Sequence, residues 1–292
     1  MNISRILLGL MLIIGAGGAV ATGTSAFFSD TESSTGNVFT AGAIDLTIDN
    51  ESYYNGVLNQ ATSWVATNLD ETHKFFDFDD LKPDDFGEDT ISIHVGSNNA
   101  WMCAAARITD DSDQSCTEPE LSDDGTCSTP GLGQGELDSV LNFAFWADDG
   151  DNVYEPGQSA TGTPETIFLG GPLSALASST QKIALATPTG GAFGTNPVPG
   201  GSTGYIGKIW CAGTLTPTGL VQNGTNTGSP LTLGTGFTCD GTLVNNAAQT
   251  DQVQGDMQFY AVQARNNPNF SCTSYVPTWP TPTPTATPTS DV

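Results

Sequence analysis

The sequence predicts an all-β protein, a jelly-roll-like antiparallel β-sandwich with short helical and loop insertions. Hydrophobic and polar residues alternate with a period of two at several places along the chain. Long polar connections rich in glycine, threonine and proline separate these stretches, and signals for long helices are slight. Short strands joined in this way favour packed antiparallel sheets over a parallel sheet with crossover helices.

Several segments carry the strand pattern. In the first of them, Ile44, Leu46 and Ile48 share one face, with polar residues between them. We expect strands over residues 44–48, 91–95, 102–108, 141–146, 183–186, 205–210 and 257–262. Residues 135–141 and 172–178 predict helical insertions of about two turns each, since a helix rises roughly 1.5 Å per residue.

Composition limits the classes of function. The chain of 292 residues carries 7 basic and 32 acidic side chains, a net charge of -25. Such a surface repels phosphate groups and anionic lipid, so the sequence predicts no nucleic-acid binding. The acids concentrate in the first half, because 27 of the 32 fall between Asp30 and Glu155. There they either recruit divalent cations or keep the surface solvated.

Residues 1–26 have the pattern of a secretion signal. Arg5 precedes an apolar run that is shorter than the roughly 20 residues of a membrane span. Small residues allow cleavage after Ala21 or after Ala26, and we favour Ala26, with Phe27 as the new N-terminus. The alternative is an uncleaved membrane anchor. We therefore predict a secreted, extracellular or cell-surface protein that meets the membrane only through this signal before cleavage.

The six cysteines of an exported chain predict three disulfides. Six cysteines allow 15 connectivities, among which sequence does not choose. We favour two pairs that close local loops and one pair that ties an early strand to a late one: Cys116 with Cys127, Cys211 with Cys239, and Cys103 with Cys272. A metal–thiolate site is not expected, because the chain has no Cys-x-x-Cys spacing.

The chain changes character near its C-terminus. Residues 276–292 are rich in threonine and proline, which favours an extended polyproline II spacer because proline cannot donate ladder hydrogen bonds. The predicted organisation is therefore a signal peptide over residues 1–26, one sandwich domain over residues 27–275 and a Pro/Thr-rich tail.

One acidic loop resembles loops that bind calcium. Calcium takes roughly six to eight oxygen ligands. The loop around Gly150 offers several of them: Asp149, Asp151, Asn152 and Glu155. The loop departs from the EF-hand pattern, because Gly150 precedes Asp151 instead of following the third ligand. Two interpretations stay open at this point, a bound Ca²⁺ and a bare solvated hairpin.

A second acidic stretch, residues 78–89, is interpreted as a structural turn rather than a cation site. The sequence Lys82-Pro83-Asp84-Asp85 has the chemistry of a β-turn, with proline suited to the second position and aspartate tolerant of the third. We expect this turn to lead directly into the strand at residues 91–95.

Motifs for catalysis are lacking. The only histidines are His73 and His94, and no His-Glu-x-x-His sequence is present from which to build the helix of a zinc peptidase. All six cysteines of the chain have a disulfide explanation, so none is left as a candidate nucleophile. Paired carboxylates abound, yet no pair is distinguished as an acid and a base. We predict that the protein is not an enzyme.

Two motifs resemble a known family. Ala26-Phe27-Phe28-Ser29-Asp30 and the following Gly-Asn-Val-Phe-Thr-Ala-Gly-Ala-Ile-Asp-Leu at residues 36–46 resemble the N-terminal signature of the TasA and camelysin family of exported biofilm-fibre proteins. The turn Leu81-Lys82-Pro83-Asp84-Asp85 is similar to the family's Leu-Lys-Pro-Gly-Asp, with aspartate in place of glycine. The resemblance covers roughly residues 20–95 and is looser beyond them, where the cysteines set this chain apart from TasA.

The resemblance implies how the protein matures and assembles. Precursors of the family are cut by a SipW-type signal peptidase close to the position of Ala26. The mature N-terminal segment then leaves its own jelly roll and completes the sheet of the next subunit, which gives a head-to-tail homopolymer. Residues 27–40 suit that joint because they offer apolar anchors on a polar frame: Phe27, Phe28, Val38 and Phe39. The alternative is an ordinary first strand packed on its own subunit.

Three functions from different classes are compatible with these features. The first is a secreted structural subunit of extracellular fibres or biofilm matrix, assembled by donor-strand exchange. The second is a monomeric calcium-binding surface adhesin that uses the loop from Asp148 to Glu155. The third is a camelysin-like metallopeptidase, which the missing zinc motif disfavours.

Overall fold

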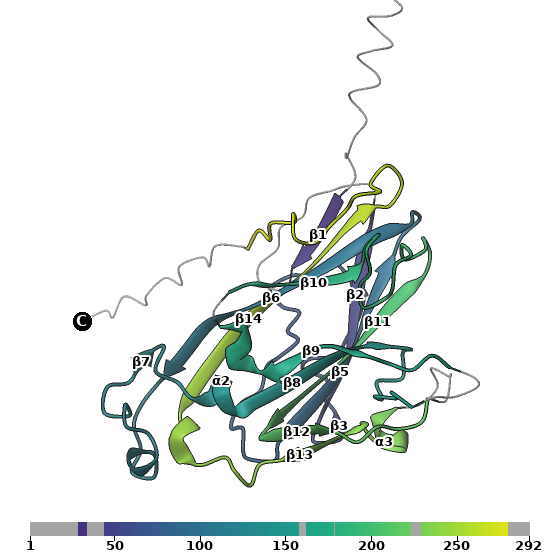
Figure 1. The fold of residues 1–292 in the computed structure, drawn as a ribbon. Coiled ribbons are helices and arrows are strands. Elements are labelled where there is room, and N and C mark those ends of the chain that lie inside the picture. The colour runs from purple at the N-terminus through teal and green to yellow at the C-terminus, as the bar shows by residue number, and fades with distance from the viewer. Residues whose placement is uncertain (1–28, 34–43, 158–161, 178, 223–228, 280–292) are drawn as a thin grey trace, which may run out of the picture.

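The chain folds into two packed antiparallel β-sheets. The computed structural model describes the backbone of residues 29–33 and, in full, residues 44–157, 162–177, 179–222 and 229–279. Within them lie one sheet of five strands, one sheet of seven strands and a separate two-stranded ribbon (Figure 1). This arrangement confirms the predicted all-β sandwich with short helical and loop insertions.

The first sheet contains five strands: β1 Ser29–Ser33, β6 Ala100–Asp113, β7 Gly131–Leu132, β10 Gln181–Ala186 and β14 Asp251–Gln263. Their order is β1, β14, β6, β10, with β7 paired to the end of β6. The long strand β6 pairs with β14 along nearly its whole length, and β1 lies on the other side of β14. β1 therefore forms one edge of this sheet.

The second sheet contains seven strands: β2 Leu46–Tyr54, β3 Val57–Leu58, β4 Trp64–Thr67, β5 Phe86–Val95, β8 Leu141–Asp148, β9 Ile167–Pro172 and β11 Thr203–Ala212. Their order is β3, β2, β5, β11, β8, β9, and β4 also pairs with β2. The chain crosses between the sheets from β5 to β6 and again from β10 to β11. These crossings fit a jelly-roll-like connection pattern.

Short elements fill the connections: η1 Glu120–Ser122, α2 Leu137–Val140, η2 Leu173–Leu176, β12 Thr214–Pro217, α3 Pro230–Leu233, β13 Phe237–Asp240 and η3 Asn246–Ala248. The ribbon consists of β12 and β13. Helices α2 and η2 lie inside the two predicted helical insertions, and each of the predicted strand segments overlaps an observed strand.

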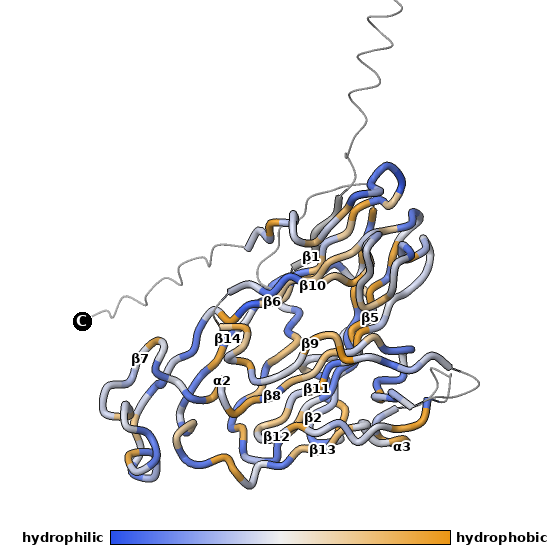
Figure 2. Tube along the Cα trace, in the orientation of Figure 1, coloured by the Kyte–Doolittle hydropathy of each residue, from blue (hydrophilic) through white to orange (hydrophobic). Residues whose placement is uncertain are grey.

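Alternating residues build the main core between the sheets. Ile91 and Ile93 on β5 and Phe259 on β14 are fully buried in one hydrophobic cluster. Figure 2 shows hydrophobic residues concentrated along the paired strands, whereas the loop after β14 is hydrophilic. On β8, Phe143 and Phe145 belong to this core. These apolar residues face the core at every second position, as the sequence pattern predicts, although on β5 the intervening Thr90 and Ser92 are buried as well.

Three disulfides join the predicted partners and confirm the predicted pairing: Cys103–Cys272, Cys116–Cys127 and Cys211–Cys239. The first connects β6 to the segment that follows β14, and the other two close local loops. Such bridges are typical of chains that fold in an oxidising compartment.

The predicted turn before β5 is confirmed. The N–H of Asp85 donates to the carbonyl oxygen of Lys82 at 3.0 Å, which closes the turn. Asp84 adopts a φ of 75°, in the left-handed region that favours glycine. This is the position at which the similar family motif has glycine.

Candidate functional site

β1 is held at the edge of its sheet by a short ladder. Its five residues pair antiparallel with the C-terminal part of β14, from Ser29 opposite Val262 to Ser33 opposite Gln258. The sequence of β1 is Ser-Asp-Thr-Glu-Ser, so it offers main-chain hydrogen bonds rather than apolar anchors. Within the described ranges, no strand pairs with that side of β14 at residues 251–257.

A groove lies beside this unpaired part of β14. Its volume is about 1110 Å³. It is lined by the segment from Lys74 to Pro83, by β14 from Asp251 to Met257, and by apolar core side chains: Phe143, Phe145, Leu176 and Trp210. An unpaired strand edge and a partly apolar groove are therefore adjacent, which is the arrangement that peptide-binding sheets use to take up an extra strand.

The residues predicted to join subunits cannot be placed in this arrangement. Phe27, Phe28, Val38 and Phe39 lie outside the described residues, as does the predicted cleavage site at Ala26. Their roles stay predictions.

The acidic loop predicted to bind calcium follows β8 and packs on the other face of the seven-stranded sheet. There Trp146 forms a second hydrophobic cluster with Tyr154 and Phe237. Gly207 on the neighbouring strand allows the Trp146 ring to lie flat on the sheet, because an added Cβ at Gly207 would come within 2.1 Å of that ring. Burial of the loop follows from this aromatic packing.

Two carboxylates hold the shape of the loop. Asp148 Oδ2 accepts hydrogen bonds from the N–H of Gly150 at 2.9 Å and of Asn152 at 3.2 Å. Glu165, two residues before β9, accepts from the N–H of Asp149 at 3.1 Å and of Glu155 at 2.8 Å. The loop therefore uses acidic side chains in place of a regular backbone ladder.

Several polar atoms in this region are buried without a hydrogen-bond partner: Asp149 Oδ1, Asp151 Oδ2, Asn152 Oδ1 and Nδ2, and both carboxylate oxygens of Glu88. Glu88 comes from β5 and is fully buried. Unpartnered buried oxygens cost free energy, and a bound cation would satisfy them.

Burial and mutual repulsion raise the pKa values of these acids. Desolvation, followed by the charge of Asp148, raises the pKa of Glu165 to about 9 and that of Asp151 to about 7. Burial raises the pKa of Asp148 itself to about 6. Desolvation and then repulsion from Asp148 and Asp89 raise the pKa of Glu88 well above its usual range. The cation-free cluster therefore favours protonated acids.

Glu88→Gln is expected to stabilise the cation-free protein at pH 8. Folding raises the pKa of Glu88, so its carboxyl binds a proton more tightly in the folded state than in the unfolded state. The free energy of unfolding therefore falls as the pH rises from the unfolded pKa, roughly 4.3, through the folded pKa. In a chelating buffer, the wild-type melting temperature should fall between pH 5.5 and pH 8. The variant should melt several degrees higher at pH 8 and show a smaller fall.

Glu71→Gln is the matched control for this experiment, because Glu71 is an exposed acid and its removal changes the net charge equally. We expect that variant to keep the wild-type pH dependence. Equal effects of the two substitutions would show that Glu88 titrates as an ordinary surface acid.

The four predicted calcium ligands lie on the loop after β8, and three of them are buried: Asp151, Asn152 and Glu155. Among the described residues, the carboxylates of Asp149, Asp151 and Glu155 do not form a set with oxygens within 4.8 Å of one another. Sequence reasoning missed the part played by Asp148, Glu165 and Glu88 as site residues. Asp148 adjoins the predicted ligands, so its acidic neighbours could have indicated it. Glu88 had no local signal, because only the pairing of β5 and β8 with β11 brings it beneath the loop.

The two histidines lie in separate places and each contacts one aspartate. His94 Nε2 lies 2.5 Å from Asp49 Oδ2, and His73 Nδ1 lies 2.8 Å from Asp70 Oδ1. Neither belongs to a group of potential metal ligands within the described part of the chain. The lack of peptidase activity stays a prediction.

Three disulfides are compatible with an extracellular location. Across the described ranges, every helix is too short or too polar to cross a membrane. Neither a scan against protein-family models nor a search of curated proteins finds a match to this chain.

Proposed function

We propose that the protein is a secreted subunit of an extracellular fibre, in which the N-terminal strand of one copy pairs with β14 of the next. The observation that carries this proposal is the edge of β14. On the side of β14 that faces away from β6, the polar strand β1 pairs with only five residues. The rest of that side, beside the groove, pairs with no strand among the described residues. Such an edge is a template for pairing with another chain.

The register of β1 supports a longer joint than the one within a single chain. Ser33 lies opposite Gln258. Continued in the same antiparallel register, the strand would place Thr40 opposite Asp251, where β14 begins. Residues 27–40 of a neighbouring copy would thus cover β14 from end to end, and the apolar part of that segment would reach the groove.

Export and assembly are linked in this proposal. Cleavage after Ala26 by a SipW-type peptidase releases the strand that joins subunits, with Phe27, Phe28, Val38 and Phe39 as its apolar anchors. A head-to-tail joint of this kind is heterologous, so it propagates into a filament instead of closing into a dimer.

A cysteine pair across the ladder tests the joint. Thr31 lies opposite Tyr260. Directly opposed residues of an antiparallel pair have Cα atoms roughly 4.5–5.5 Å apart, which a disulfide can span. We expect oxidised Thr31→Cys/Tyr260→Cys protein to give a ladder of covalent oligomers on a non-reducing gel, and filaments in electron microscopy.

Thr31→Cys alone is the matched control and should give at most a covalent dimer. Deletion of residues 27–40 should abolish filaments and leave the unfolding of the sandwich nearly unchanged. If the double variant yields only internally linked monomers, and the undeleted protein forms no filaments, the strand belongs to its own subunit and the proposal is wrong.

A second candidate function, a monomeric calcium-binding adhesin, is favoured by the unpartnered buried oxygens of the loop after β8. The proposed ligands are those of the sequence prediction: Asp149, Asp151, Asn152 and Glu155. This function requires monomers that bind a surface in a calcium-dependent manner, and that lose this binding in the Asp151→Asn variant. Electron microscopy with and without calcium separates it from the fibre subunit.

A further inference from the structure

We propose that Asp113, Glu120 and Asp124 form a calcium site at the end of β6, separate from the acidic loop after β8. Each residue offers one carboxylate oxygen, and these three oxygens lie within 4.8 Å of one another. That spacing suits ligands of a single cation, because calcium–oxygen bonds measure roughly 2.3–2.6 Å. Among the described residues, the loop after β8 holds no such set of three carboxylates.

Each of the three side chains is more than nine-tenths buried. One oxygen of each carboxylate is held by a backbone N–H of its own loop: Asp113 Oδ1 by Ser115 at 3.0 Å, Glu120 Oε2 by Thr117 at 3.0 Å and Asp124 Oδ1 by Thr126 at 2.7 Å. The other oxygen of each is buried with no hydrogen-bond partner. The hydrogen bonds therefore fix the orientation of each carboxylate before a cation binds. A bound cation would give each of the three unpartnered oxygens a partner.

Within the described part of the chain, no ion pair neutralises these acids, because none includes Asp113, Glu120 or Asp124. Asp113 also lies directly opposite Asp251 in the ladder between β6 and β14. Like charges facing each other across a ladder are destabilising, and a divalent cation between them reverses the sign of that interaction.

Two further acids lie beside these three carboxylates, because Asp251 faces Asp113 across the ladder and Asp251 Oδ2 accepts a hydrogen bond from the N–H of Glu136 at 2.6 Å. Glu136 Oε2 and Asp251 Oδ1 are also buried without a hydrogen-bond partner. The three carboxylates of the proposed site supply part of the roughly six to eight oxygens that calcium takes, and backbone oxygens and water would supply the others.

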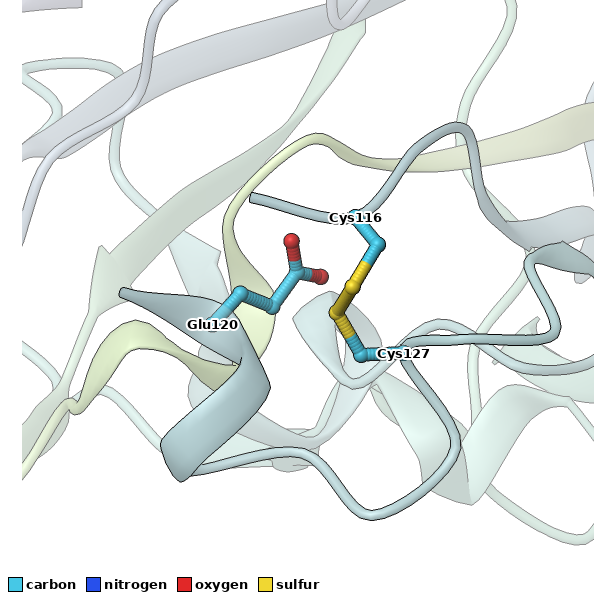
Figure 3. A group of neighbouring side chains, drawn as sticks. All are labelled: Cys116, Glu120 and Cys127. Carbon is cyan, nitrogen blue, oxygen red and sulfur yellow. A yellow bond between two sulfur atoms is a disulfide. The ribbon is translucent and has the colours of Figure 1, made fainter. Parts of the chain in front are cut away.

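The Cys116–Cys127 disulfide closes the loop that carries two of the ligands. Figure 3 shows Glu120 beside this bridge, and its carboxylate lies within 4.8 Å of both sulfur atoms. Because the sulfur atoms are bonded to each other, they are not thiolate ligands, and the donor set consists of oxygens. An all-oxygen set favours calcium over zinc. The bridge limits the freedom of the loop before the cation binds, which reduces the entropy lost on binding.

Calcium titration of the full chain tests the site by calorimetry and by thermal unfolding. We expect the wild-type melting temperature to rise by about 5–10 °C at a calcium concentration roughly 100 times the dissociation constant. Glu120→Gln/Asp124→Asn should lose one calorimetric binding event, or weaken it more than about tenfold. In a chelating buffer the same variant should melt above the wild type, because its buried repulsion is reduced, and this shows that it folds.

Glu118→Gln is the matched control, since Glu118 is an exposed acid in the same loop. It should bind calcium as the wild type does. Asp151→Asn should also keep the calorimetric binding event that the Glu120→Gln/Asp124→Asn variant loses. This result would separate the proposed site from the loop after β8. The proposal is overturned if the wild type binds no calcium, or if the double variant binds as many ions as the wild type with the same affinity.

Discussion

Replacing Cys103 and Cys272 by alanine is expected to lower the free energy of unfolding by about 5 kcal/mol. The bridge joins residues that are 169 positions apart, so its removal frees most of the sandwich in the unfolded chain. Both cysteines are buried, and nearby the rings of Tyr260 and Tyr275 stack at 4.3 Å. Urea denaturation followed by circular dichroism, in a chelating buffer, measures the change.

The Cys116→Ala/Cys127→Ala variant is the control for loop length. Its bridge spans only 11 positions, and the same entropy relation gives a loss of about 3 kcal/mol. The long-range bridge should therefore stabilise the protein more than the local one. An equal or larger loss from the local pair would mean that native contacts, rather than chain entropy, determine what each bridge contributes.

Lys208→Met is expected to cost about 3–5 kcal/mol of unfolding free energy, because it leaves a buried carboxylate without its cation. Lys208 Nζ lies 2.8 Å from Asp89 Oδ2, and both side chains are fully buried. The same ammonium donates to the carbonyl oxygen of Phe75 at 2.9 Å and lies 3.6 Å from the centre of the Phe76 ring. The substitution therefore also loosens the segment that lines the groove beside β14.

The loss should depend on pH in a defined direction. Burial raises the pKa of Asp89, and in the variant no ammonium opposes that effect. A carboxyl with a raised folded pKa loses stability as the pH rises through that value, so Lys208→Met should be more damaging at pH 8 than at pH 5. Denaturation curves at the two pH values provide the measurement.

Two further variants complete the test of this pair. Lys208→Met/Asp89→Asn removes both charges and should recover most of the loss, because a neutral buried pair needs no counter-charge. Lys74→Met removes an exposed lysine and should change the unfolding free energy by less than about 0.5 kcal/mol. A Lys208→Met protein as stable as the Lys74→Met control would rule out a structural role for the ion pair.

Sequence reasoning predicted most of the fold because the signals that it uses are local. Alternation placed Ile91 and Ile93 on the buried face of β5, and proline with aspartate predicted the turn closed by Lys82 and Asp85. The disulfide partners also followed from a simple preference for local loops and one long-range tie.

The buried charges were not predicted, because alternation cannot distinguish a solvated face from a covered one. Lys208 lies on the same face of β11 as Ile206 and Trp210, which belong to the main core, so a charged residue interrupts the apolar pattern there. Its burial requires β11 to lie between β5 and β8, and requires the segment around Phe75 to cover that face. Glu88 is buried for a related reason, since the loop after β8 packs over its side of the sheet.

The sequence by itself determined the strands, the turn and the acidic loop after β8, since each depends on residues close together in the chain. It predicted three disulfides from cysteine chemistry, and the structure decided their connectivity. Only the tertiary structure decided which acids gather in one place. Asp113, Glu120 and Asp124 match no metal-binding motif, and their oxygens meet because a disulfide closes one loop against the end of β6. Strand register and loop closure are set by contacts between distant residues, and local periodicity carries no information about them.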